Sequence, residues 1–153
     1  MITLRPARPT DAGKIGAILS AFIDQTDWMP RLHSRAEELA FCGAMIDRGW
    51  VTVAEDAGRV QGFLARDGAE VNCLYVTDAA QGQGVGKALL DHAKAGAERL
   101  ELWTFQANAG ARRFYAREGL AELRLTDGAG NDEQMPDVFL AWEKGAPCAA
   151  THS

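Results

Sequence analysis

A glycine-rich segment at residues 81–86 follows an apolar stretch and precedes a run with helical spacing. Gln81, Gly84 and Gly86 have the spacing Q-x-x-G-x-G. Because glycine lacks a β-carbon, backbone N–H groups can converge there on an anion, and the N-terminus of a helix adds its positive dipole end. The pattern indicates a pyrophosphate site, although a plain turn between a strand and a helix has the same composition.

Two nucleotide motifs come close to this segment, and both fail. The P-loop pattern G-x-x-x-x-G-K-[ST] is met at Gly86 and Lys87, but position 81 is Gln and position 88 is Ala. The dinucleotide pattern G-x-G-x-x-G requires glycine at its sixth position, which is Lys87 when the pattern starts at Gly82 and Leu89 when it starts at Gly84. Neither nucleotide class is therefore predicted.

A second motif further along the chain makes the pattern specific. The first run resembles the acyl-CoA signature of the GNAT superfamily of N-acetyltransferases: Leu74-Tyr75-Val76, Q-x-x-G-x-G, then Ala88-Leu89-Leu90. The second run resembles that superfamily's other motif: Asn108-x-x-Ala111-x-x-Phe114-Tyr115-x-x-x-Gly119-Leu120. The element order is similar from Ile2 to about Trp142. Arg is commoner in the family where Gln83 stands, which weakens one phosphate contact.

The resemblance implies acetyl-CoA as co-substrate and no metal. The backbone of Leu74, Tyr75 and Val76 would bond the pantetheine amides, with Asn108 as a further partner. The pyrophosphate would lie on the segment Gln81, Gly82, Gln83, Gly84, Val85, Gly86 and Lys87. Ala111, Phe114 and Tyr115 would complete the cofactor site. Simpler readings stay open, because Lys87 could be a solvated lysine and Asn108 a helix N-cap.

Catalytic roles also follow from the resemblance. The Val76 N–H would donate to the oxyanion of the tetrahedral intermediate. The Tyr115 hydroxyl would protonate the departing thiolate, and phenol and thiol pKa values are close enough for this exchange. Glu70 stands where histone-modifying members carry a glutamate base, and Glu55 and Glu101 are rivals. The alternative for Tyr115 is a core aromatic beside Phe114, which the motif register disfavours, and deprotonation relayed by water needs no single base.

The acceptor side has weaker signals. The loop at residues 26–33 lies where family members close over the acceptor, and its Trp28 and Met29 are apolar. Asn72 shares a strand face with Glu70, and Trp103 could line a pocket or belong to the core. A second variable loop, residues 127–136, carries Asn131, Asp132 and Glu133. The identity of the acceptor amine and the acyl chain length are left open.

Hydrophobic periodicity predicts the elements that position these residues. Strands are expected at residues 2–5, 50–55, 60–66, 70–76, 100–105, 121–126 and 137–142. Helices are expected after Thr10 and Asp11, after the Ser34–Glu37 capping box, over residues 85–97 and after Asn108. The fold class is α+β, a mixed and mostly antiparallel sheet of six to seven strands with about four flanking helices, as in the GNAT fold. A single domain over residues 1–144 precedes a tail, 145–153, expected to be disordered.

Composition narrows the class of protein. The net charge is −5, and basic residues do not cluster, so that neither nucleic-acid nor membrane partners are predicted. The three cysteines lack metal or disulfide spacing, which fits reduced thiols in the cytoplasm. Members of the family often pair through their last strands, so that the resemblance is compatible with a homodimer.

These inferences converge on an enzyme that transfers an acetyl group from acetyl-CoA to a primary amine of a small molecule or peptide. The amine would attack directly and form a tetrahedral intermediate. A non-catalytic acyl-CoA-binding sensor or regulatory module is the alternative, since it would keep the pyrophosphate segment but could dispense with Tyr115. An interaction domain without coenzyme A affinity is a third reading.

Overall fold

The computed structural model describes residues 1–145, which fold around one seven-stranded sheet. The strands are β1 (Ile2–Pro6), β2 (Val51–Asp56), β3 (Arg59–Asp67), β4 (Glu70–Val76), β5 (Arg99–Phe105), β6 (Ala121–Thr126) and β7 (Asp137–Glu143). The α-helices are α1 (Ala12–Gln25), α2 (Arg35–Asp47), α3 (Val85–Ala95) and α4 (Ala109–Arg117). This is the predicted order of elements. The predicted tail lies outside the described residues except for Gly145, so that the domain boundary stays a prediction.

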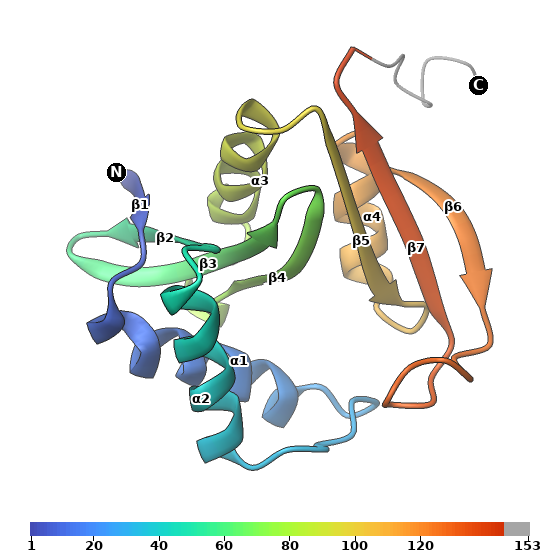
Figure 1. Ribbon diagram of the computed structural model, residues 1–153, viewed down its shortest axis with the longest axis horizontal. Helices are drawn as coiled ribbons and strands as arrows, with labels where there is room; N and C mark the ends of the chain where they lie inside the picture. The colour runs from blue at the N-terminus through green and yellow to red at the C-terminus, as the bar shows by residue number, and fades with distance from the viewer. Residues whose placement is uncertain (146–153) are drawn as a thin grey trace.

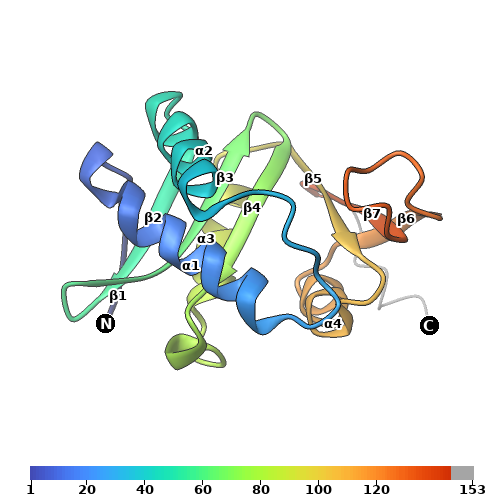
Figure 2. The same cartoon turned by 90° about the horizontal axis from the view of Figure 1, so that it is seen from below.

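The sheet has the strand order β1-β2-β3-β4-β5-β7-β6, and only β4 and β5 run parallel. Helices α1 and α2 cover one face of β2–β4, whereas α3 and α4 lie on the other face (Figures 1 and 2). Each face has its own buried core. The predicted mixed sheet flanked by four helices is therefore confirmed. No helix within residues 1–145 is long and apolar enough to cross a membrane.

The start of α2 confirms one local prediction and corrects another. Ser34 and Glu37 form the capping box, with the Glu37 N–H donating to Ser34 Oγ at 3.1 Å. The helical period predicts that Leu39 is buried together with Cys42, Met45 and Ile46, but Leu39 is 44% exposed, whereas Glu38 is only 5% exposed. The buried carboxylate is stabilised by the guanidinium of Arg31 and the hydroxyl of Ser20, which the helical period alone cannot reveal.

A buried ion pair joins the edge of the sheet to the start of α1. The guanidinium of Arg5 on β1 donates to both carboxylate oxygens of Asp11, at 2.8 and 3.0 Å, and also pairs with Glu55 on β2. The Arg8 N–H donates to Asp11 at 2.7 Å. The bond from Arg5 is the main cause that lowers the pKa of Asp11 from 3.8 to about 2, although burial opposes it.

This ion pair predicts a pH-dependent stability. Because the folded state holds Asp11 ionised below its ordinary pKa, the pair stabilises the fold fully above pH 4 and loses this effect as pH falls toward 2. Asp11→Asn is expected to lower the free energy of unfolding by about 2 kcal/mol at pH 7, and the difference from wild type should vanish near pH 2. Urea unfolding across this range measures it. Asp56→Asn, at an exposed pair with the N-terminus, is the control and should change little. A pH-independent difference for Asp11→Asn would contradict the assignment.

Candidate active site

The two central strands separate soon after they meet. β4 and β5 pair only at Glu70 and Glu101, and the Glu101 N–H donates to the Ala69 carbonyl at 2.8 Å. Beyond this point they diverge, as Figure 1 shows. The remaining length of β4 therefore has a bonded neighbour on one side only, which is β3.

A bulge in β4 decides which backbone groups face the opening. The register with β3 skips Asn72, so that this residue is the extra one on β4. Thr77 donates to the Gln61 carbonyl at 2.8 Å, and hydrogen-bonded pairs alternate along an antiparallel ladder, so that Tyr75 also pairs with β3. Leu74 and Val76 consequently turn their N–H and C=O groups toward β5, where no strand pairs with them. Of the three residues predicted to bond the pantetheine amides, Leu74 and Val76 thus have backbone groups available to a ligand, whereas those of Tyr75 already pair with β3.

The glycine-rich segment forms the N-terminus of α3. Gly82 and Gly84 have φ values of +79° and +84°, a left-handed conformation that glycine adopts without strain. The first bond of the helix runs from Ala88 N–H to Gly84 O, so that the N–H groups of residues 85–87 have no partner within the helix. The segment therefore presents several free donors and the positive end of a helix dipole beside the C-terminal end of β4.

The side chains of this segment are less available than its backbone. Lys87 Nζ pairs with Glu118 at 3.0 Å and with Asp91 at 3.3 Å. Gln83 donates to the Ala79 carbonyl at 3.0 Å. Gln81 is exposed and makes no hydrogen bond through its side chain within residues 1–145. A phosphate here would meet backbone N–H groups first, and Lys87 would have to leave two carboxylates to reach it.

Helix α4 supplies the second motif. Asn108 caps it, with Oδ1 accepting from the Ala111 N–H at 3.0 Å, which leaves the Asn108 amide nitrogen without a bond in the described chain. Phe114 lies against the helix start, since a β-carbon on Gly86 would stand 3.4 Å from its ring. Tyr115 is 8% exposed, and burial raises the pKa of its hydroxyl. The motif thus brings an unused amide and a buried, protonated phenol to the face that carries α3.

The loop between α1 and α2 is fixed by an ion-pair network that sequence reasoning missed. Arg31 binds Glu38 at 2.6 and 2.7 Å and Asp24 at 2.5 Å. It also donates to the Ser20 carbonyl at 3.2 Å. The network positions Trp28, whose ring centroid lies 5.9 Å from that of Phe105 on β5. Figure 2 shows this loop crossing from α1 toward the end of β5, and the half-buried Met29 lies beside Trp28 in it.

A cavity of about 510 Å³ lies on the same face, between β5, β6 and the β6–β7 loop. Its lining includes Trp103, Phe105, Arg124, Asn131, Glu133 and Asp137. Of the predicted acceptor residues, Trp103 lines it and is 45% exposed. Trp28 contacts Phe105 and so borders this region without lining the cavity, whereas Asn72 is exposed on β4 and does not line it.

The three candidate carboxylates differ in their partners. Glu55 is paired with Arg5, and Glu101 accepts from Arg99 at 3.1 Å. Glu70 is exposed, and its side chain makes no hydrogen bond or ion pair within the described residues. Because the next residue, Val71, belongs to the core beneath α3, Glu70 faces the α1–α2 side. Only Glu70 is therefore uncommitted among these three.

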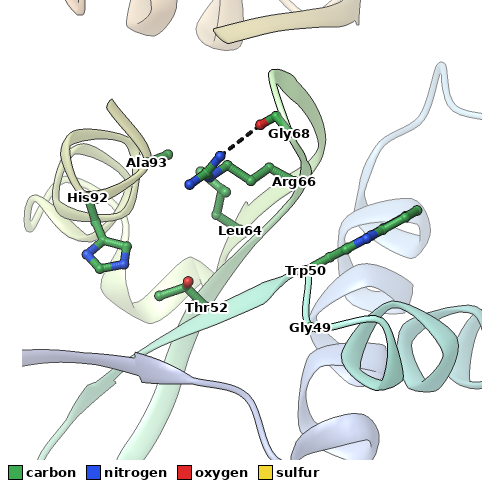
Figure 3. Close-up of a pocket in the computed structure, with 8 residues that line it drawn as sticks. All are labelled: Gly49, Trp50, Thr52, Leu64, Arg66, Gly68, His92 and Ala93. Atoms are coloured by element: carbon green, nitrogen blue, oxygen red, sulfur yellow. Dashed lines mark hydrogen bonds between the residues drawn. The ribbon is translucent and has the colours of Figure 1, made fainter. Parts of the chain in front are cut away.

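A second cavity, of about 300 Å³, lies away from all of these residues (Figure 3). His92 and Ala93 of α3 and Thr52, Leu64 and Arg66 of the sheet line it. Arg66 donates to the Gly68 carbonyl at 2.8 Å, across the turn between β3 and β4. No predicted site residue lines this cavity. The described chain also contains no cluster of three or more side chains able to hold a metal ion.

Comparison with known proteins identifies the family. A model described as an acetyltransferase (GNAT) domain matches residues 47–119. The peptidyl-lysine N-acetyltransferase YjaB of Salmonella typhimurium is 30% identical over 122 residues, which cover 78% of this chain and 83% of the relative.

Solved structures share the fold. Apo-form YjaB from Escherichia coli has a TM-score of 0.77 at 23% identity and covers 95% of this chain and 99% of its own. The putative acetyltransferase yncA from Salmonella typhimurium, solved with its cofactor acetyl-CoA, has a TM-score of 0.72 at 23% identity. The match covers 97% of this chain and 99% of that structure. The diverging strands, the glycine-rich helix start and the Asn108–Tyr115 motif thus occur in a chain that belongs to the GNAT family of acetyl-CoA-dependent N-acetyltransferases.

Proposed function

We propose that this enzyme acetylates a primary amine, on a small molecule or a peptide, by direct attack on acetyl-CoA. The observation that carries the proposal is the free backbone edge of Leu74 and Val76 beside the start of α3. Pantetheine contains two amides and can pair with such an edge as an added strand would. The pyrophosphate then falls at Gly82–Lys87, where the N–H groups of residues 85–87 are free.

The chemistry follows from these positions. The amine nitrogen attacks the thioester carbonyl, and the oxyanion accepts from a β4 N–H, for which Val76 is our candidate and Leu74 has the same orientation. One donor of this kind is typically worth about 3 kcal/mol. When the C–S bond breaks, the thiolate takes a proton from the Tyr115 hydroxyl, and the phenolate is reprotonated by the proton that the attacking nitrogen loses as the amide forms. Burial raises the pKa of this phenol, so that it is protonated before attack but is a weaker acid than a free phenol, and the proton from the nitrogen restores it.

Transfer through an acetyl-cysteine intermediate is poorly supported. Cys73 lies on β4, but burial raises the pKa of its thiol to about 12, and it belongs to the core beneath α1 and α2. A thiol is nucleophilic only as the thiolate. Direct attack by the amine therefore fits this site better than a two-step route.

Glu70 is our candidate base. It lies four residues before Leu74, about 13 Å along a strand, so that it would act through water rather than by direct contact. A substrate ammonium with a pKa near 10 must lose its proton before attack. The carboxylate would receive that proton and release it to solvent.

The acceptor class draws support from the relatives. YjaB is a peptidyl-lysine N-acetyltransferase, and a lysine side chain is a primary amine on an apolar stem. A small-molecule amine has the same reacting group, so that the proposal includes both peptide lysine and small amines as acceptors. The sensor alternative would retain acetyl-CoA binding without releasing free CoA, which separates it from an enzyme.

Location and assembly are further proposals. Free, buried thiols at Cys42 and Cys73 favour a reducing compartment such as the cytoplasm. The acidic net charge disfavours nucleic-acid and anionic membrane partners. Exposed Leu123 and Leu125 on the edge strand β6 favour a homodimer through that edge.

A glycine substitution tests the pyrophosphate site. Gly84→Ala strains the left-handed backbone at φ +84°, which orients the free N–H groups at the start of α3, and is expected to raise the Kd for acetyl-CoA about tenfold by calorimetry. Gly58→Ala is the matched control, because φ is +77° there and the residue lies in the β2–β3 turn. Both variants should lose about 1 kcal/mol of stability. Equal acetyl-CoA affinities in the two variants would contradict the site.

Removal of one hydroxyl tests the acid. Tyr115→Phe is expected to lower kcat about 10- to 100-fold, because the thiolate must then leave without a proton donor. The Kd for acetyl-CoA should be unchanged. Release of free CoA, followed with a thiol reagent, measures turnover. A kcat within twofold of wild type would remove Tyr115 from the mechanism.

The base is tested through its pH dependence. Glu70→Gln is expected to lower kcat/KM about tenfold at pH 7, and the loss should shrink as the pH approaches 10, where the amine is already neutral. Glu101→Gln is measured in parallel, because Glu101 lies opposite Glu70. A larger loss in Glu101→Gln, or a loss in Glu70→Gln that does not vary with pH, would argue against Glu70.

A further inference from the structure

The 510 Å³ cavity contains one carboxylate that nothing in the fold uses. Asp137 is buried and accepts from Thr126 and, at 3.0 Å, from the Asn131 amide. Glu133 is half-buried, lines the same cavity and makes no hydrogen bond or ion pair within residues 1–145. Partial burial of an unpaired carboxylate is costly unless a partner arrives. Glu133 is therefore available to a ligand, whereas Asp137 is not.

The loop that carries Glu133 is built to hold its shape. The Asn131 amide donates to the Met135 carbonyl at 2.7 Å, and the Met135 N–H donates back to Asn131 at 3.2 Å. Gln134, with φ +55°, donates to the carbonyls of Ala129 and Asn131. The position of Glu133 is thus fixed before any ligand binds.

Aromatic rings connect the cavity that Glu133 lines to β4. The ring centroid of Trp28 lies 6.4 Å from that of Phe22, which in turn lies 5.0 Å from that of Tyr75. Tyr75 lies between Leu74 and Val76, whose free backbone groups face the diverging strands. Phe105 lines the cavity and touches Trp28. An acceptor held by Glu133 would therefore lie among aromatic rings close to the thioester.

The lining of the cavity also includes the opposite charge. The guanidinium carbon of Arg124 lies 5.3 Å from the centroid of the Trp103 ring, a cation–π arrangement that holds this side chain against the aromatic lining. Arg124 is exposed and makes no ion pair within the described chain. The cavity is thus lined by a carboxylate and a cation that have no charged partner in residues 1–145, together with the rings of Trp103 and Phe105.

We propose that Glu133 anchors the ammonium group of the acceptor, and that Arg124 selects at its other end for an anionic over a cationic group. The expected acceptor is a primary ammonium on an apolar stem whose far end is neutral or negative. Free amino carboxylates and lysine side chains of peptides share this chemistry. Neither residue takes part in bond making: Glu133 positions the amine before it is deprotonated. The inference rests on the proposed acetyl transfer and specifies its acceptor.

The test of Glu133 uses pentylamine as the probe and a matched pair of variants. Glu133→Gln keeps the shape of the side chain and removes its charge. Asp132→Asn makes the same change at the neighbouring exposed residue, which does not line the cavity. We expect Glu133→Gln to raise the KM for pentylamine about tenfold, the usual size for a charge-assisted contact, with little change in the KM for acetyl-CoA. Asp132→Asn should match wild type.

The outcomes separate this inference from the function on which it rests. If wild type releases no CoA with any amine, the acetyltransferase proposal fails. If wild type turns over but Glu133→Gln keeps a pentylamine KM within twofold of wild type, the proposal for Glu133 fails while the enzyme stands. An increase in the acetyl-CoA KM of Glu133→Gln as large as that in the amine KM would also overturn it, because the effect would then be structural.

Selection by Arg124 is tested with three acceptors of similar stem. Pentylamine ends in a methyl group, cadaverine ends in a second ammonium, and 6-aminohexanoate ends in a carboxylate. Wild type should prefer 6-aminohexanoate to cadaverine by about threefold or more in kcat/KM at low salt, and the preference should weaken at higher ionic strength, since Arg124 is exposed. Arg124→Gln should abolish the preference. Equal kcat/KM values in wild type would overturn the role of Arg124.

A peptide arm distinguishes the two sources of amine. A terminally blocked peptide with one lysine presents the same ammonium and stem as pentylamine. A larger kcat/KM for the peptide than for 6-aminohexanoate assigns the cavity to peptide lysine, and the reverse order assigns it to free amino carboxylates. Glu133→Gln should raise the KM for the peptide and for 6-aminohexanoate alike. An unchanged KM for either acceptor would contradict a shared anchor.

Discussion

The structure depends on a constraint in the middle of the sheet: beyond Glu70, β4 pairs with β3 but not with β5. A seven-stranded sheet would normally satisfy its central backbone groups through both neighbours. Here Leu74 and Val76 keep theirs free, and a backbone group left unsatisfied when buried costs about 1–3 kcal/mol. A ligand that carries amides along this edge recovers that cost. The proposed binding of pantetheine thus depends on incomplete pairing of β4 rather than on particular side chains.

Helix α3 can approach this edge because one position on β3 lacks a side chain. A β-carbon on Gly62 of β3 would lie 3.0 Å from both the Tyr75 carbonyl oxygen and a methyl carbon of Val85 at the start of α3. A β-carbon on Gly86 would lie 3.4 Å from the Phe114 ring, an ordinary contact distance, so that α4 packs directly against the start of α3. The proposed cofactor site is therefore formed where β3, β4, α3 and α4 pack closely together.

The opposite face is organised by polar contacts in two loops. Arg31 holds the α1–α2 loop through Glu38 and Asp24, and the Asn131–Met135 pair holds the β6–β7 loop. These loops bring Trp28 toward Phe105 and Glu133 into the cavity. Rigid loops position charged groups at little entropic cost during binding, which suits the recognition of a small cation. In the proposed mechanism, the cofactor and the acceptor would thus meet at β4 from opposite faces of the sheet.

The sequence alone determined the family, the order of the elements and the Q-x-x-G-x-G helix start, because these depend on local periodicity, capping and glycine placement. The bounds of β4 and β6 were predicted to the residue, and Asn108 was expected to cap α4. Only the tertiary structure decided that Tyr75 bonds β3 while Leu74 and Val76 stay free, because a bulge at Asn72 shifts the strand register without a signal in the hydrophobic pattern. It likewise paired Lys87 with Glu118 and left Glu133 without a partner among residues 1–145, since such charge partners are distant in sequence and meet only when the sheet and its loops are folded.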